Sequence, residues 1–202
     1  CATECGAWSA ESAITVLLPP PAPTLTVPAS SNTGAYSVSW TASTAATRYE
    51  LQERVGSGNW AQIYSGAGTS QARSGRANGT YAYRVRGCAT ECGAWSAEGT
   101  ITVLLPPPAP TLSVPASSNT GAYSVSWTTS AGATRYELQE RVGSGSWTQL
   151  YSGASTSQTR TGRANGTYAY RVRGCATECG SWSAEGAITV LLPPPAPTLT
   201  AP

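Results

Sequence analysis

The side chains of this chain that are suited to covalent or metal chemistry are six cysteines and ten carboxylates, and every carboxylate is a glutamate. The chain has no His and no Asp, so it cannot form a Ser-His-Asp or Cys-His relay, an imidazole zinc site or an aspartate-rich calcium loop. Glu50 and Glu53 are three residues apart on an expected strand and face opposite sides, unlike a pair of glycosidase carboxylates. These residues predict a chain that is not an enzyme and that needs no cofactor and no metal.

The cysteines form three Cys-x3-Cys pairs: Cys1 and Cys5, Cys88 and Cys92, Cys175 and Cys179. Two thiols in each repeat, without histidine, are too few for a structural zinc site within one unit. A short disulfide within each pair is therefore the favoured interpretation over a metal site. Disulfides persist in oxidising compartments, which predicts an extracellular or cell-surface location.

The elements that position these residues come from a long internal repeat. Residues 1–87 return as residues 88–174 with 12 substitutions, and a third copy begins at Cys175. A unit of this length is one small domain with its own core, and near-identical units favour length or multivalency over one tailored active site. The net charge of +2 argues against a nucleic-acid partner, and the proline run after Leu18 argues against membrane insertion.

Within one unit, short runs rich in Tyr, Val, Trp and Leu alternate with clusters of Gly, Pro, Asn and Ser every eight to twelve residues. This pattern is typical of an all-β sandwich. Alternation predicts strands at residues 36–40, 48–53 and 80–86, with a last strand at residues 101–103. Trp40, Tyr49 and Leu51 are expected to face the core, and so is Trp127 in the second unit.

The chain resembles tandem fibronectin type III domains throughout its length. The residues that carry this resemblance are an entry proline, a tryptophan on the second strand, and the Tyr-x-Leu and Tyr-x-Tyr-x-Val strands: Pro23, Trp40, Tyr49, Leu51, Tyr81, Tyr83 and Val85. The resemblance implies immunoglobulin-like β-sandwiches in an extended array, with Tyr81 bonded to backbone as a tyrosine corner. The wording "YELQERVGSGNW" and "NGTYAYRVRG" is also similar to repeats of large secreted bacterial proteins, including RHS (YD-repeat) proteins.

The repeat predicts domain boundaries. We expect a last-strand fragment of an upstream repeat at residues 1–18, complete domains at residues 19–105 and 106–192, and a first-strand fragment at residues 193–202. Either the chain is a window on a longer array, or neighbouring chains complete the partial domains. The prolines that follow Leu105 favour a semi-rigid, extended linker.

Two features could carry binding. Trp95 follows the hairpin tip and lies across from the outward side chains of Arg84 and Arg86, as Trp182 does for Arg171 and Arg173. We expect a stacked arginine–tryptophan ladder there, and the alternative is an exposed tryptophan platform for a sugar or a protein. Asn78 and Asn165 lie in N-glycosylation sequons, although Asn-Gly is also a favoured tight turn in front of a strand.

Taken together, the sequence predicts a structural repeat segment, a stalk, spacer or fibre of a secreted or cell-surface protein. Its expected partners are adjacent repeats or copies of the same protein. The alternative is a carbohydrate- or protein-binding accessory module of a larger secreted enzyme, adhesin or toxin.

Overall fold

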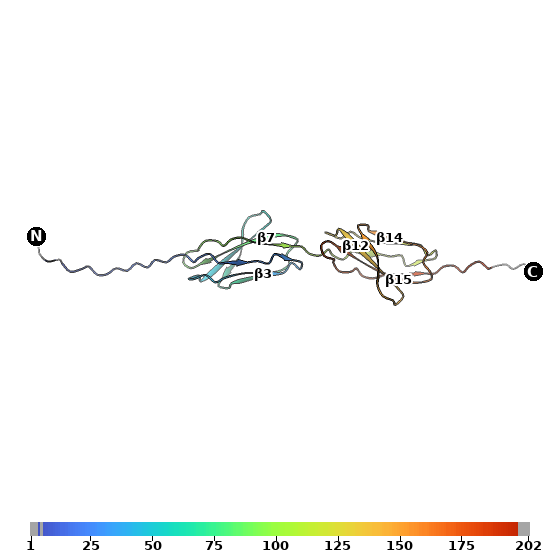
Figure 1. Ribbon diagram of the computed structural model, residues 1–202, viewed down its shortest axis with the longest axis horizontal. Helices are drawn as coiled ribbons and strands as arrows, with labels where there is room; N and C mark the ends of the chain where they lie inside the picture. Colours follow the sequence, from blue (N-terminus) through green and yellow to red (C-terminus); the bar gives the residue numbers. More distant parts are fainter. Residues whose placement is uncertain (1–3, 5, 198–202) are drawn as a thin grey trace, which may run out of the picture. The chain divides into compact units, whose positions relative to one another are not determined.

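The computed structural model describes residue 4 and residues 6–197. The chain is divided into two compact units, Cys1–Leu104 and Leu105–Pro202, each with its own core (Figure 1). The described residues are all strand, turn and irregular chain. None of them forms a helix that is long and apolar enough to cross a membrane.

The first unit has a sheet of three strands and a sheet of five. The smaller sheet has the order β1-β3-β6 and the larger has the order β2-β8-β7-β4-β5, with β2 running parallel to β8. The strands are β1 (Leu25–Thr26), β2 (Ser30–Ser31), β3 (Tyr36–Trp40), β4 (Arg48–Val55), β5 (Ala61–Gly66), β6 (Ser70–Arg73), β7 (Gly79–Cys88) and β8 (Gly99–Val103).

The second unit repeats this topology, with sheets of order β14-β11-β9 and β10-β16-β15-β12-β13. Its strands are β9 (Leu112–Ser113), β10 (Ser117–Ser118), β11 (Tyr123–Trp127), β12 (Arg135–Val142), β13 (Thr148–Gly153), β14 (Ser157–Arg160), β15 (Gly166–Cys175) and β16 (Gly186–Val190). Both units are β-sandwiches of two sheets, so the expected all-β sandwich fold is confirmed.

The core lies between the two sheets and follows the period-2 alternation of the strands. Trp40 from β3 is only 5% exposed, and its ring lies 6.0 Å from Tyr49 and 5.6 Å from Tyr64. Leu51 on β4 and Val85 on β7 are fully buried beside it. Tyr81 forms the tyrosine corner, because its hydroxyl donates to the Ala77 carbonyl at 2.9 Å, four residues back.

A buried carboxylate joins the two sheets at one end of the core. Glu53 on β4 is 7% exposed and forms ion pairs with Arg76 and, at 2.9 Å, with Arg73 on β6. The Tyr83 hydroxyl donates to it at 2.6 Å and is also hydrogen-bonded at 2.7 Å to the Tyr36 hydroxyl on β3. Burial, with the hydrogen bond to Glu53, raises the pKa of Tyr83 above its ordinary value, so Tyr83 stays a neutral donor. The second unit repeats this arrangement around Glu140.

The prolines at the start of each sandwich are part of its packing. Pro20 and Pro107 are buried, and a Cβ added to Gly174 would lie 3.3 Å from the Cβ of Pro107. The glycine therefore allows the proline to lie against the sheet. In contrast, residues 6–18 form no strand, and Trp8 is 99% exposed.

Candidate functional site

The outer face of the five-stranded sheet carries a continuous stack of arginine and tryptophan side chains. The guanidinium carbon of Arg84 on β7 lies 4.6 Å from the ring centre of Trp95, and that of Arg86 lies 4.4 Å from the same ring. The other side of Arg84 faces Trp60 at 4.4 Å, and Arg54 on β4 faces Trp60 at 4.8 Å. We call this set, Arg54, Trp60, Arg84, Trp95 and Arg86, the Arg-Trp ladder.

Strand β4 holds the ladder's guanidinium groups in place. Arg84 donates from Nε and Nη2 to the Gln52 side-chain oxygen at 2.9 and 2.7 Å, and Arg86 donates in the same way to Glu50. Gln52 and Glu50 are the direct cross-strand neighbours of these arginines in the β4–β7 register. A planar guanidinium with two hydrogen bonds that converge on one oxygen atom has a fixed orientation, so it can stack on a ring.

Ser96 places Trp95 on this face. The segment after the hairpin tip runs beside β7 because the Ser96 N–H donates to the Val85 carbonyl at 2.8 Å. The Ser96 hydroxyl in turn accepts from the Val85 N–H at 3.1 Å. The serine hydroxyl therefore takes the place of one backbone acceptor, and the neighbouring Trp95 lies against the arginines.

The second domain has the same stack, formed by Arg141, Trp147, Arg171, Trp182 and Arg173, with guanidinium-to-ring distances between 4.4 and 4.8 Å. Trp60 and Trp147 each lie close to two arginines, and the sequence analysis did not predict their part in the stack. The Gly-Ser-Gly turn before each tryptophan gave no sign of this stacking. The stacking follows from the registers in which β5 and β7 pair with the two edges of β4, and the sequence alone does not determine these registers.

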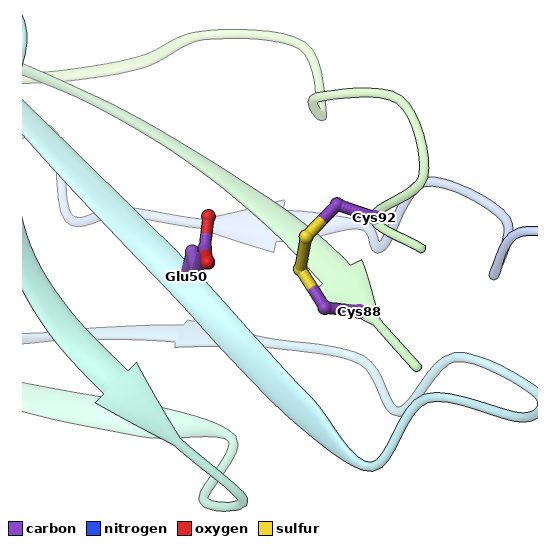
Figure 2. A group of neighbouring side chains, drawn as sticks. All are labelled: Glu50, Cys88 and Cys92. Carbon is purple, nitrogen blue, oxygen red and sulfur yellow. A yellow bond between two sulfur atoms is a disulfide. The ribbon is translucent and has the colours of Figure 1, made fainter. Parts of the chain in front are cut away.

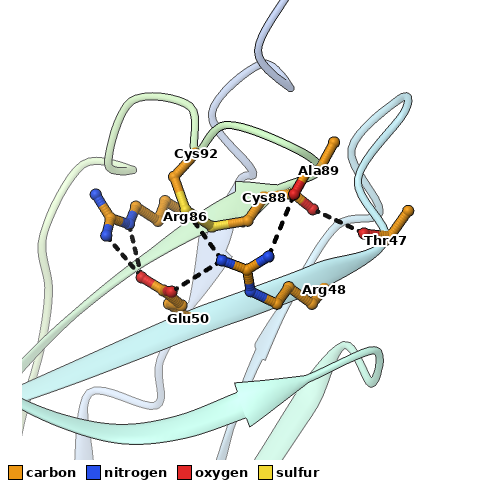
Figure 3. The surroundings of a disulfide bond; sticks show 7 residues. All are labelled: Thr47, Arg48, Glu50, Arg86, Cys88, Ala89 and Cys92. Atoms are coloured by element: carbon orange, nitrogen blue, oxygen red, sulfur yellow. Dashed lines mark hydrogen bonds and ion pairs between the residues drawn. A yellow bond between two sulfur atoms is a disulfide. The ribbon is translucent and has the colours of Figure 1, made fainter.

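The hairpin tip after β7 is closed by the Cys88–Cys92 disulfide, with an S–S distance of 2.03 Å, and Cys175 and Cys179 are bonded in the same way. Cys1 lies outside the described residues, as does Cys5. Figure 3 shows how Arg48 joins the tip to β4, because its guanidinium donates to the Ala89 carbonyl at 3.2 Å and approaches the Cys92 sulfur at 3.7 Å. The bridge therefore fixes the turn that leads to Trp95.

Among the described residues, one set of neighbouring side chains in each domain resembles a metal site: Glu50, Cys88 and Cys92 in the first domain (Figure 2), and Glu137, Cys175 and Cys179 in the second. Their ligand atoms lie within 4.8 Å of one another. The two sulfurs are bonded to each other, and the carboxylate is shared by Arg86 at 2.7 Å and Arg48 at 3.5 Å. Two guanidinium groups at the same carboxylate repel a cation, so this cluster is a structural ion-pair group.

Hydrogen bonds from Arg86 hold the pKa of the Glu50 carboxyl below its ordinary value, against the opposite effect of burial. A carboxyl whose pKa is lower in the folded state stabilises the fold above its unfolded pKa of about 4.3, and that stabilisation is lost as the pH falls through the folded value. We expect the E50Q variant to lose less stability than the wild type between about pH 5 and pH 3. Urea unfolding of both proteins across that range checks this, with exposed Glu11→Gln as the matched control. Parallel pH profiles for wild type and E50Q would contradict it.

Arg84 is the central contact of the ladder, since it touches both tryptophans. We expect Arg84→Ala to cost about 1–2 kcal/mol, as two partly exposed cation–π contacts contribute about 0.5–1 kcal/mol each. The stability of Arg84→Lys should lie between those of Arg84→Ala and the wild type, because lysine keeps the positive charge but lacks the planar guanidinium group. Unfolding in guanidinium chloride measures the effect on stability, and the tryptophan fluorescence maximum reports on the surroundings of Trp60 and Trp95. If neither Arg84→Ala nor Arg84→Lys changes the stability of the domain, the stack contributes no stability.

The ladder also determines what the tryptophans can bind. Trp60 and Trp95 are both half-buried, and each ring lies between two guanidinium groups. A sugar stacks on the free face of an aromatic ring, and the arginines occupy these faces. The alternative of an exposed tryptophan platform at Trp95 therefore stays a prediction, which the arginines over its ring disfavour.

The two sequon asparagines lie where β7 and β15 begin, and both are exposed. Asn165 has a structural contact, because its side-chain oxygen accepts a hydrogen bond from the Leu192 N–H at 2.6 Å. This contact ties the turn before β15 to the end of β16. Glycosylation of either asparagine stays a prediction.

Comparisons with known proteins give only similarity of fold. No family model matches the chain, and no curated protein matches it. Solved structures that match include the FN1–FN3 domains of chicken CNTN1, at 16% identity and a TM-score of 0.44, over 86% of this chain and 67% of that one. A segment of two fibronectin type III domains from chicken tenascin matches at 18% identity and 0.45, over 84% and 98%. A cytokine receptor complex matches at 21% and 0.44, over 82% and 95%. None of these matches supports the narrower resemblance to bacterial RHS proteins.

Proposed function

We propose that this chain is a non-catalytic structural segment of an extracellular or cell-surface protein, in which stable sandwiches follow one another as a spacer or stalk. In this proposal residues 19–105 and 106–192 are the repeating domains, and residues 1–18 and 193–202 are parts of their neighbours. The observation that carries it is that both complete domains repeat the same core, the same cross-sheet ion pairs and the same ladder. Near-identical units favour length or multivalency over one tailored active site.

The connection between the domains supports a stiff spacer. On one side, the Leu104 N–H donates to the Ser31 carbonyl at 2.9 Å, which fixes the end of the first sandwich. On the other side, Pro107 is buried in its own sandwich and the Ser130 hydroxyl donates to the Pro108 carbonyl. Only Leu105 and Pro106 lie between these anchored points. A linker this short, and continued by prolines, leaves the chain few ways to bend.

The extracellular part of the proposal rests on the two disulfides, since such bonds persist in oxidising surroundings. Its partners in this proposal are adjacent repeats or further copies of the protein. An accessory role in a larger secreted protein is compatible with the same architecture. A carbohydrate role is less favoured, because arginines cover the faces of the ladder's tryptophans.

Force spectroscopy on the tethered chain tests this role. A spacer of independent domains should unfold in two separate events of similar force. Each event should lengthen the chain by about 28 nm, which is 87 residues at about 3.6 Å each, less about 3 nm of folded strand. A single event of about twice that length, or extension without a resolved force peak, would contradict a spacer of independently folded, stable domains.

A further inference from the structure

Residues 6–18 have the sequence of a last strand but lie outside any sheet. Counting in steps of 87 residues aligns Ile14 with Ile101 of β8, and Val16 with Val103. Ile14 is 88% exposed, whereas Ile101 is 1% exposed. A segment with this pattern is suited to pair with a sheet edge of the same fold.

One substitution separates this segment from both last strands that are in place. Ser12 aligns with Gly99 at the start of β8 and with Gly186 at the start of β16. The other differences are at positions 13 and 7, and at each of them one of the two complete domains has the same residue as the segment. The serine is therefore the one feature of residues 6–18 that neither complete domain shares.

The packing around Gly99 leaves no room for a side chain. A Cβ at this position would lie 2.7 Å from Cγ2 of Val27 and 3.2 Å from Cδ2 of Leu25. The second domain repeats the contact, with a Cβ at Gly186 lying 2.7 Å from Cγ2 of Val114. Valine is branched at Cβ and has few rotamers, so its methyl group cannot turn away at low cost. A strand with serine here would strain the first strand of either sandwich.

The next copy of the repeat differs in sequence at the residue that makes this contact. In steps of 87, Val27 and Val114 are followed by Ala201, which lacks the γ-methyl groups. Ala201 lies outside the described residues, and only its identity is used here. The sequence therefore contains a serine that needs space and an alanine that would provide it.

We propose that Ser12 determines which sandwich residues 6–18 can join. Their partner is a β-sandwich of the same repeat that has alanine at the position of Val27, the residue that the sequence has at position 201. The two valine-containing domains reject the segment, so residues 6–18 cannot take the place of β8 or β16. The proposal rests on the role of the chain as an array, and it adds the rule by which the array keeps its strands in order.

The first test is a double-mutant cycle at Gly99 and Val27 in the full chain. Calorimetry measures the melting temperature of the first domain, and the unchanged second domain is the internal reference. Gly99→Ser should lower the melting temperature of the first domain by about 5–15 °C. Val27→Ala added to Gly99→Ser should recover at least half of that loss, and it keeps the test readable if the single variant does not fold. A neutral Gly99→Ser, or losses that simply add in the double variant, would overturn the proposal.

The second test measures strand exchange. The full chain is refolded at high protein concentration, and light scattering measures the molar mass of the refolded species. Wild type and S12A should refold as monomers. S12G should yield dimers that increase with concentration, because its segment fits the valine-containing domains. S12G that stays monomeric, or wild type that dimerises equally, would show that Ser12 is not the selector. Neither result depends on mechanical resistance, so this proposal can fail while the spacer role stands.

Discussion

Trp40→Ala is expected to destabilise the first domain by about 3–5 kcal/mol, enough to leave a domain of about 5–15 kcal/mol marginal or unfolded. The indole of Trp40 fills the core between Tyr49 and Tyr64, and truncation leaves a cavity that two stiff sheets cannot close. Chemical unfolding of the full chain measures the effect, because the second domain keeps its own transition. A first-domain transition at the wild-type midpoint would show that Trp40 is not a core residue.

Two further variants make this test specific. Trp8→Ala is the matched control, because Trp8 is fully exposed and its loss should be neutral. Trp40→Phe should cost much less than alanine, for two reasons. Phenylalanine keeps most of the buried ring, and the buried indole N–H of Trp40 has no hydrogen-bond partner among the described residues, so nothing polar is lost.

Glu53→Ala is expected to cost about 3–5 kcal/mol, the usual range for removing one partner of a buried ion pair. The variant leaves Arg73 and Arg76 close together without their shared carboxylate, and it removes the acceptor of the Tyr83 hydroxyl. Urea unfolding at neutral pH measures it. Glu98→Ala removes an exposed carboxylate that pairs only with Arg54 in a described ion pair, and it should cost less than about 1 kcal/mol.

The Glu53 cluster also predicts coupling between the sheets. Glu53 lies on β4 of the larger sheet, whereas Arg73 lies on β6 of the smaller one. Arg73→Ala in a Glu53→Ala background should therefore cost less than Arg73→Ala alone. Additive losses would mean that the ion pair does not join the sheets energetically.

The strands and their inward faces could be predicted because period-2 alternation survives in single stretches of sequence. Tyr49, Leu51 and Glu53 share one parity on β4, and all three are buried. The alternation gave the side on which Glu53 lies. Alternation alone could not predict that Glu53 is buried. The positive charges that compensate the Glu53 carboxylate come from β6 and from the loop before β7, which are distant in sequence.

The candidate site shows the same division. Arg84, Arg86 and Trp95 lie within one hairpin, so local alternation was enough to bring them together. Trp60 joins the ladder only because β5 and β7 pair with opposite edges of β4. Register between strands is a tertiary property, and a single sequence holds little information on it. The clash that a serine would cause at the position of Gly99 could not be predicted from the sequence either. It depends on the contact between Gly99 and Val27, which are distant in sequence.

Small-angle X-ray scattering on chains with two, four and eight complete repeats tests the spacer role most directly. The short, proline-anchored linker predicts that the maximum dimension grows linearly, by about 30–40 Å for each added repeat. The radius of gyration of the cross-section should stay constant. A maximum dimension that grows as the cube root of mass would contradict the account, because the repeats would then fold back into a compact body.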